Sequence, residues 1–367
     1  MPEPLKYLYD RGFIEHLAAC VSCEVKGFDA DKLIFKIKDE QWQNRELKER
    51  LRHITLCLGQ TLPGDYEEQL QTVCCIADKF KDFEHSGLLG MVFPDFVEVY
   101  GFKNPDISIP ALKYLTQFSS SEFAIRPFIL GNATKIMNSL NLWAKDKDKH
   151  VRRLASEGCR PRLPWAMALP IFKKDPSAIL PILEMLKQDE SLYVRRSVAN
   201  NLNDISKDNP EVVLDIAERW KGQCEETDWI VRHGLRSLLK QGNERALNLF
   251  DYRNIQPEQI LFCLKNDKVM LGDCVDFDIN LKFPAQIKDT SLKLRVEYMI
   301  EFAGANGRVR KKIFQLCQKN TVPAELKSQK SYAFKDLSTR KHYAGPHAIN
   351  LIVNGQTIAR SCFEVIA

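Results

Sequence analysis

The sequence predicts a mainly α-helical repeat solenoid followed by a small all-β sandwich. Two observations carry this prediction. Apolar residues recur at helical spacing through the first two thirds of the chain, where a short arginine motif also repeats. After Asn254 the pattern changes to alternation of polar and apolar residues, which is typical of strands. We therefore expect two domains, residues 1–255 and 256–367.

Helices are predicted wherever apolar residues follow the 3.6-residue period. Two clear examples are the runs Leu47, Leu51, Ile54, Leu58 and Leu70, Val73, Ile76, Phe80. Proline and glycine fall mainly between such runs, as loops require. Pro176 and Pro210 stand where a proline in the first turn would begin a helix, so we expect helices to start there.

An arginine motif repeats in one register along the helical part. Its copies are Val151-Arg152-Arg153, Val194-Arg195-Arg196 and Val231-Arg232-His233, with a weaker fourth copy at 123–128. Successive valines are 43 and 37 residues apart, and spacings near ~40 with two helices per unit are typical of HEAT-like repeats. The alternative is that the motif merely marks amphipathic helices with a solvated basic face.

The sequence pattern of the C-terminal part is typical of an immunoglobulin-like sandwich. Residues 276–283, 292–298 and 348–353 alternate polar and apolar side chains. Asn354-Gly355 stands between two such runs and is a strong hairpin signal, and 304–307 is a second turn. Short strands at this spacing over about a hundred residues predict a two-sheet sandwich.

Composition bounds the function classes. No apolar run approaches the ~18 residues of a membrane-spanning helix, and no signal peptide is seen. The 11 cysteines lack a recurring pair with zinc spacing, so we expect no structural metal and a reducing, cytoplasmic setting. The net charge is only +5, so a basic face on the helical domain must arise by segregation of charge.

A basic stripe is expected on the concave face, which the second helix of each repeat lines. Arginines at the start of such helices, near the positive end of the helix dipole, suit phosphate groups of duplex DNA. The candidates are Arg126, Arg152, Arg153, Arg195, Arg196 and Arg232. Alternatively, some of them cap carbonyl groups or pair with Asp148, Asp189 and Asp228 between repeats.

The segment from Arg152 to Trp165 is the most unusual in the chain. A helix runs into a loop that holds two arginines, two prolines and a tryptophan, and the prolines stiffen its path. Arg160 and Arg162 are expected to project toward DNA, and Trp165 to pack on a sugar or base. The alternative for Trp165 is burial between repeats.

Three carboxylates fall near the same side: Glu122, Glu157 and Asp204. Acidic groups that face DNA are electrostatically unfavourable unless they perform chemistry. They are therefore our catalytic candidates, and the alternative is an ion pair between each of them and a neighbouring arginine.

Residues 151–165, together with 121–128 and 194–204, resemble the AlkC family of DNA glycosylases, relatives of AlkD. The resemblance covers nearly the whole chain, since this family can carry a C-terminal immunoglobulin-like domain, which residues 338–347 resemble. It implies a DNA repair enzyme that hydrolyses the N-glycosidic bond of cationic alkylated bases such as 3-methyladenine in double-stranded DNA, without metal or organic cofactor.

Such a base already carries positive charge, so a carboxylate needs only to stabilise the sugar cation and orient water. The C-terminal domain would add DNA contacts through the basic clusters at Arg308 and Arg340. We expect a monomer without membrane association. Two other functions stay open: a non-catalytic repeat protein that binds damaged or bent DNA, and a repeat scaffold for proteins.

Overall fold

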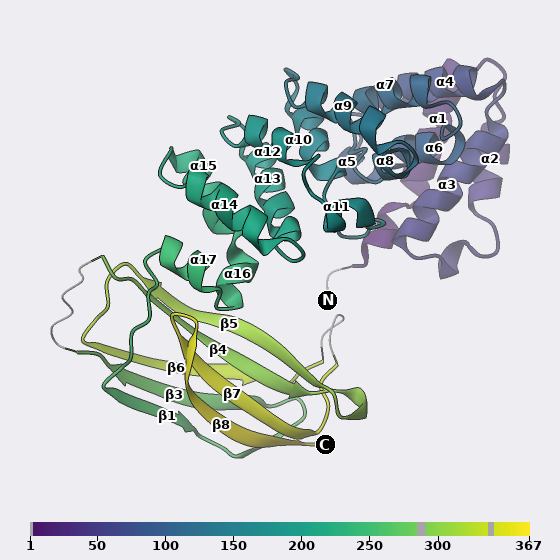
Figure 1. The fold of residues 1–367 in the computed structure, drawn as a ribbon. Coiled ribbons are helices and arrows are strands. Elements are labelled where there is room, and N and C mark those ends of the chain that lie inside the picture. The colour runs from purple at the N-terminus through teal and green to yellow at the C-terminus, as the bar shows by residue number, and fades with distance from the viewer. Residues whose placement is uncertain (1–2, 285–290, 337–340) are drawn as a thin grey trace. The chain divides into compact units, whose positions relative to one another are not determined.

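The computed structural model describes residues 3–284, 291–336 and 341–367. They form two compact units (Figure 1). The first comprises the chain up to Val213 together with Arg219–Gly234, and the second comprises Leu214–Glu218 and Leu235–Ala367. Each unit is described by itself below.

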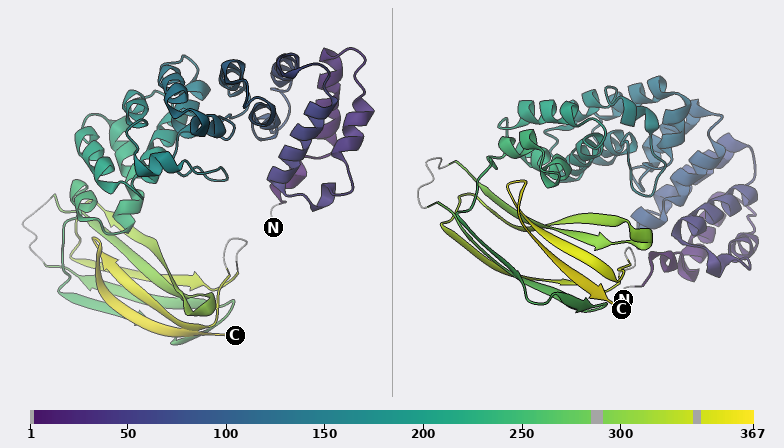
Figure 2. Two further views of the ribbon diagram at one scale, coloured as in Figure 1. Left: turned by 45° about the vertical axis from the view of Figure 1, so that its right-hand side comes forward. Right: turned by 60° about the horizontal axis from the view of Figure 1, so that its bottom comes forward.

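The first unit is built of helices that follow one another along the chain, as the purple-to-teal ribbon in Figures 1 and 2 shows. Neighbouring pairs pack together, among them α3 on α6, α10 on α13 and α13 on α15, so the predicted helical-repeat solenoid is confirmed. Its helices are α1 Arg11–Glu24, α2 Ala30–Ile37, α3 Leu47–Thr61, α4 Tyr66–Lys79, α5 Ser86–Leu89, α6 Val92–Tyr100, α7 Pro105–Leu115, α8 Ile125–Gly131, α9 Ala133–Trp143, α10 Lys149–Gly158, α11 Pro170–Lys174, α12 Leu180–Leu186, α13 Leu192–Ile205 and α15 Glu225–Gly234, and α14 Pro210–Trp220 is divided between the two units.

Local chemistry explains where these helices begin. Asp148 caps α10 by accepting hydrogen bonds from the backbone N–H groups of His150 and Val151. Helix α14 starts at Pro210, as predicted. The expectation for Pro176 is wrong: the next helix, α12, starts at Leu180, because the Pro176 carbonyl first accepts from the N–H of Ile179 in a tight turn.

The second unit holds helices α16 Arg236–Lys240 and α17 Glu244–Leu249 and a two-sheet sandwich, which confirms the predicted immunoglobulin-like architecture. One sheet has the order β1-β3-β6 and the other β2-β8-β7-β4-β5, and all of these strands except β2 are labelled in Figure 1. The strands are β1 Gln259–Leu264, β2 Lys268–Met270, β3 Cys274–Lys282, β4 Leu294–Ala303, β5 Val309–Lys319, β6 Glu325–Ala333, β7 Gly345–Val353 and β8 Gln356–Ile366.

Alternation along the strands places the core between the sheets. On β3, Val275, Phe277, Ile279 and Leu281 are buried while the residues between them are partly exposed. The β7–β8 hairpin turns at Asn354-Gly355, where both residues have positive φ (42° and 81°), as the Asn-Gly signal predicts. We propose residue 255/256 as the domain boundary, just before β1. Among the helices of the described residues, none has the length and apolarity that crossing a lipid bilayer requires.

Asp95 on α6 is a buried carboxyl group that should make the stability of the solenoid depend on pH. The residue is 8% exposed, and burial raises its pKa to about 6 although the Arg52 guanidinium favours ionisation. Because the native pKa lies above the unfolded one, the native state binds the proton more tightly, and stability falls as pH rises from about 4 to 6. Asp95→Asn is therefore expected to match the parent at pH 4 and to raise the free energy of unfolding by roughly 2–3 kcal/mol at pH 8.

Urea unfolding at pH 4 and pH 8 measures this difference. Asp82→Asn, at an exposed site, is the control and should leave stability unchanged at both pH values. A loss of stability for Asp95→Asn at pH 8 would contradict the assignment of a burial penalty to Asp95.

Candidate active site

The three predicted carboxylates are joined by cations into one chain of ion pairs within the first unit. Arg153 lies between Glu122 (2.5 Å) and Glu157 (3.5 Å). Arg160 lies between Glu157 (2.6 Å) and Asp204 (2.8 Å), and Lys207 contacts Asp204 at 3.1 Å. We call the set Glu122, Arg153, Glu157, Arg160, Asp204 and Lys207 the ion-pair chain.

Helix geometry brings the ion-pair chain together. Arg153 and Glu157 are one turn apart on α10, so their side chains share a face. Asp204 comes from the last turn of α13, which packs on α10. Glu122 precedes α8, and its side chain is 15% exposed, against 6% for Glu157 and 2% for Asp204. The equal numbers of acids and bases compensate the burial of so many charges.

Arg153 and Arg160 hold the carboxylates in place. Burial lowers the pKa of each guanidinium, but the paired carboxylates outweigh burial and raise it overall. The guanidinium carbon of Arg153 (Cζ) lies 4.7 Å from the centre of the Tyr193 ring. Phosphate contacts were predicted for both arginines; in the structure their side chains are engaged by carboxylates, which is the alternative considered for such residues.

The first arginine of the repeated motif has the same contacts in two successive repeats. Arg152 Nη1 donates to the carbonyl oxygens of residues 146 and 147, and Arg195 Nη1 to those of 189 and 190. Arg152 also binds Asp189, at 2.6 Å. The second arginine differs between repeats: Arg153 belongs to the ion-pair chain, whereas Arg196 is exposed on α13. Arg232 is exposed on α15.

The loop after α10 is held by a buried cation. Arg126 is fully buried, and its guanidinium donates to the carbonyls of Gly158 (2.9 Å) and Met167 (2.7 Å). Burial lowers its pKa to about 10. Arg162 in the same loop pairs with Asp208 at 2.6 Å. The Arg126 contacts fix the Gly158 and Met167 ends of the loop, and Arg162, which was predicted to project toward DNA, has a side chain that is 37% exposed.

Trp165 is the exposed tip of this loop. Its side chain is 62% exposed, so it does not fill a space between repeats. The backbone has φ of 65°, a left-handed conformation that is strained for a bulky residue and costs on the order of 1–3 kcal/mol. Its carbonyl oxygen accepts a hydrogen bond from Lys48 Nζ at 2.6 Å. Strain of this kind gathers at functional sites.

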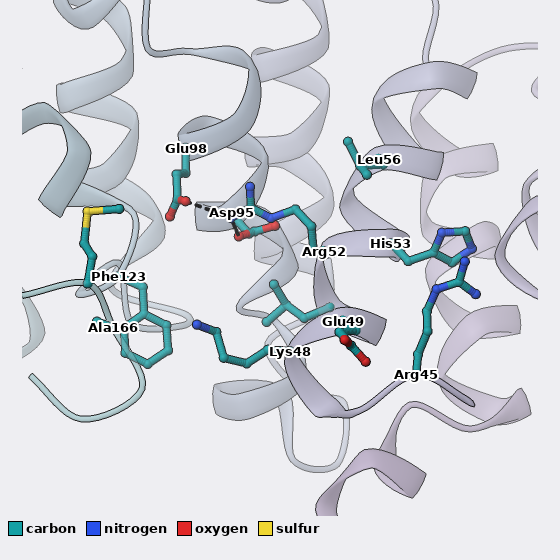
Figure 3. A pocket seen from close by; sticks show the side chains of 12 residues that line it. Arg45, Lys48, Glu49, Arg52, His53, Leu56, Asp95, Glu98, Phe123 and Ala166 are labelled. Atoms are coloured by element: carbon teal, nitrogen blue, oxygen red, sulfur yellow. Dashed lines mark hydrogen bonds and ion pairs between the residues drawn. The ribbon is translucent and has the colours of Figure 1, made fainter. Parts of the chain in front are cut away.

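A cavity of about 510 Å³ adjoins this loop. Its walls are formed by side chains of α3 and α6, by Phe123, and by Ala166 and Met167, which directly follow Trp165 (Figure 3). Arg52 binds both Asp95 (2.9 Å) and Glu98 (2.7 Å) on one wall. Since Phe123 directly follows Glu122, the cavity borders the segment that carries the outermost carboxylate.

Comparison with known proteins places the chain in a family. The structure matches that of Pseudomonas fluorescens alkylpurine DNA glycosylase AlkC, bound to DNA containing an abasic site analog, with a TM-score of 0.90, 34% identity and full coverage of both chains. The chain belongs to the AlkC family. It is also 43% identical over 364 residues to the uncharacterized protein YhaZ of Bacillus subtilis (strain 168), covering 98% of this chain and 99% of that protein.

The β-sandwich of this AlkC-family member also matches a family model. Residues 260–367 fit the C-terminal Ig-like domain of the uncharacterised protein YhaZ. Arg308 is exposed directly before β5. Arg340, the second basic residue predicted to contact DNA, lies outside the described residues. Within the described parts of the chain, no group of three or more His, Cys, Asp or Glu side chains is placed to hold a metal ion.

Three residues that contact this candidate site were missed from the sequence. Ser120 Oγ donates to Glu122 (2.8 Å) and accepts from Arg153 (3.1 Å), and its position two residues before Glu122 is the only signal that it offers. Tyr193 directly precedes a copy of the arginine motif, a position that links it to the same repeat surface. Lys48 stands 117 residues before Trp165, and no local pattern connects the two.

Proposed function

We propose that this AlkC-family protein is a monofunctional DNA glycosylase that removes cationic alkylated bases such as 3-methyladenine from duplex DNA. The observation that carries the proposal is the ion-pair chain of three carboxylates, with an exposed, strained tryptophan on the loop that follows α10. The full-length similarity to a protein named an alkylpurine DNA glycosylase, whose structure was solved with bound DNA containing an abasic site analog, supports the proposal. We further propose that the protein acts as a cytoplasmic monomer without metal or organic cofactor.

The chemistry follows from the charge of the lesion. A base alkylated at a ring nitrogen is already cationic and leaves without protonation. The barrier then lies in the cationic sugar and in the placement of water, and a carboxylate serves both. Glu122 is the most exposed of the three. Its described contacts all use Oε2, so we assign Oε1 to the attacking water.

Glu157 and Asp204 are proposed to support this site from deeper positions. Glu157 pairs with Arg153, the arginine that binds Glu122, and shares Arg160 with Asp204, so the two buried carboxylates hold Arg153 where it orients Glu122. Trp165 is proposed to pack against the damaged nucleotide, because its ring is exposed on the loop that follows α10. A rigidly held constellation of this kind favours one geometry of attack.

The direct test is release of free base from methylated duplex DNA by the purified protein in the presence of EDTA. We expect release of 3-methyladenine at a rate that the chelator does not change. No release together with tight binding to the same DNA would overturn the proposal in favour of a damage-binding protein. Release that EDTA abolishes would refute metal independence.

Arg196 is the clearest candidate for a phosphate contact, because it is exposed on the repeat helix α13. Arg196→Ala is expected to weaken binding to damaged and undamaged duplex alike and to reduce the slope of log K against log salt by about 1. Fluorescence anisotropy over a salt series measures this slope. Arg11→Ala, which removes a charge paired with Glu15 on α1, is the control, and an equal slope for both variants would remove Arg196 from the phosphate contacts.

A further inference from the structure

Lys48 joins two parts of the site that are distant in sequence. It lies on the first turns of α3, and its Nζ donates to the Trp165 carbonyl oxygen at 2.6 Å. The same Nζ lies 5.6 Å from the centre of the Phe123 ring, and Figure 3 shows the side chain pointing toward that ring. Since Phe123 follows Glu122, one ammonium group contacts both the tryptophan loop and the carboxylate segment.

The Trp165 backbone depends on such contacts. An exposed ring has little packing to fix its direction, so the backbone around it must be held by hydrogen bonds. On the C-terminal side, Arg126 holds the Met167 carbonyl at 2.7 Å. At Trp165 itself, the Lys48 ammonium group donates a hydrogen bond to the carbonyl oxygen of a residue whose backbone is left-handed. Hydrogen bonds with a charged donor are stronger than those between neutral groups.

The neighbouring cavity shows why this contact matters. Lys48, Phe123, Ala166 and Met167 all line the space of about 510 Å³. A loop with side chains packed beneath it would stay in place without Lys48, whereas this loop borders open volume into which it can relax.

We propose that Lys48 is a positioning residue that sets the placement of Trp165 relative to Glu122. The inference rests on the proposed glycosylase function, since the consequence of this placement is read as base excision. Lys48 contacts no reacting atom; it acts through the tryptophan loop.

The test is a double-mutant cycle that compares the excision rates of Lys48→Met, Trp165→Ala and the double variant with that of the parent. Lys48→Arg and Lys32→Met are the controls. Lys32 is exposed on α2, so its replacement removes the same charge without touching the loop. Lys48→Met should lower the single-turnover excision rate by about tenfold or more, because small misplacements at a reacting centre are costly. Affinity for DNA should change by less than about threefold.

In the Trp165→Ala background, Lys48→Met should have less than about a twofold further effect, because both changes then act through one group. Lys48→Arg, which keeps a charged donor, should restore most of the rate, and Lys32→Met should match the parent. Additive losses in the cycle would overturn the proposal, as would a loss in Lys32→Met equal to that of Lys48→Met.

A second readout does not depend on catalysis. The emission of Trp165 is obtained as the difference between each protein and its Trp165→Phe counterpart, and acrylamide quenching of this emission reports the placement of the ring. Lys48→Met should change the quenching constant clearly, and Lys32→Met should not. An unchanged constant would overturn the role of Lys48. Absence of base release by the parent protein, with the quenching difference present, would instead overturn the proposed function.

Discussion

Glu122→Gln is expected to lower the single-turnover rate of base release by about 10²–10⁴-fold, the range that a positioned acid or base contributes. The amide keeps the size of the side chain but cannot take a proton from water or stabilise a cationic sugar. Affinity for methylated duplex should be unchanged or higher, since a negative charge near the DNA backbone is removed. Release of labelled base and anisotropy titration on the same DNA separate these two effects.

Asp204→Asn should act in the same direction, because the site loses the carboxylate that holds Arg160. Glu190→Gln is a matched control: the Glu190 side chain is 86% exposed and reaches Arg152 only at 3.3 Å. Its excision rate should equal that of the parent. Parental rates in both Glu122→Gln and Asp204→Asn would refute the catalytic assignment of the ion-pair chain.

Arg152→Ala is expected to reduce the free energy of unfolding by roughly 3–5 kcal/mol, the usual effect of breaking a buried ion pair from one side. Asp189, with a side chain 5% exposed, would lose its guanidinium partner, and the carbonyls of residues 146 and 147 would lose a donor. Urea unfolding of Arg152→Ala beside Arg196→Ala measures the difference, because Arg196 is exposed and its removal should leave stability nearly unchanged.

The sequence predicted instead that Arg152 contacts a DNA phosphate, and this role would give a different result for Arg152→Ala. In that case Arg152→Ala would flatten the salt dependence of DNA binding and leave stability close to that of the parent. The two measurements on one variant therefore decide between a structural arginine and a DNA-contacting one.

The repeat architecture was predictable because helical period and motif spacing are local properties of the chain. The valine of each motif copy had to face the core, and Val151, Val194 and Val231 are all buried. Pro176 misled because a proline fits a tight turn as well as a helix start. The position of the turn between β7 and β8 followed from Asn354-Gly355, since few other dipeptides accept positive φ at both positions.

The site was predictable as a set of residues but not as a set of contacts. The sequence indicated that Arg160 and Asp204 belong to the same surface, but a pair 44 residues apart can meet only through the packing of α10 on α13. The burial of an arginine determines which groups it contacts, and it cannot be read from the motif. Arg126 and Arg196 both lie in copies of the arginine motif. One is fully buried among carbonyls and the other is exposed.

The matching carbonyl contacts of Arg152 and Arg195 bear on how such a protein evolves. A unit copied by gene duplication carries with it the arginine that secures its own preceding loop, so a new copy is stably folded before it has any task. The adjacent position differs between the two repeats in its surroundings, since Arg153 belongs to the ion-pair chain and Arg196 is exposed. Among relatives of this chain, the first arginine should therefore vary only together with the length of that loop, while the residue at the second position should follow the surroundings that each repeat gives it.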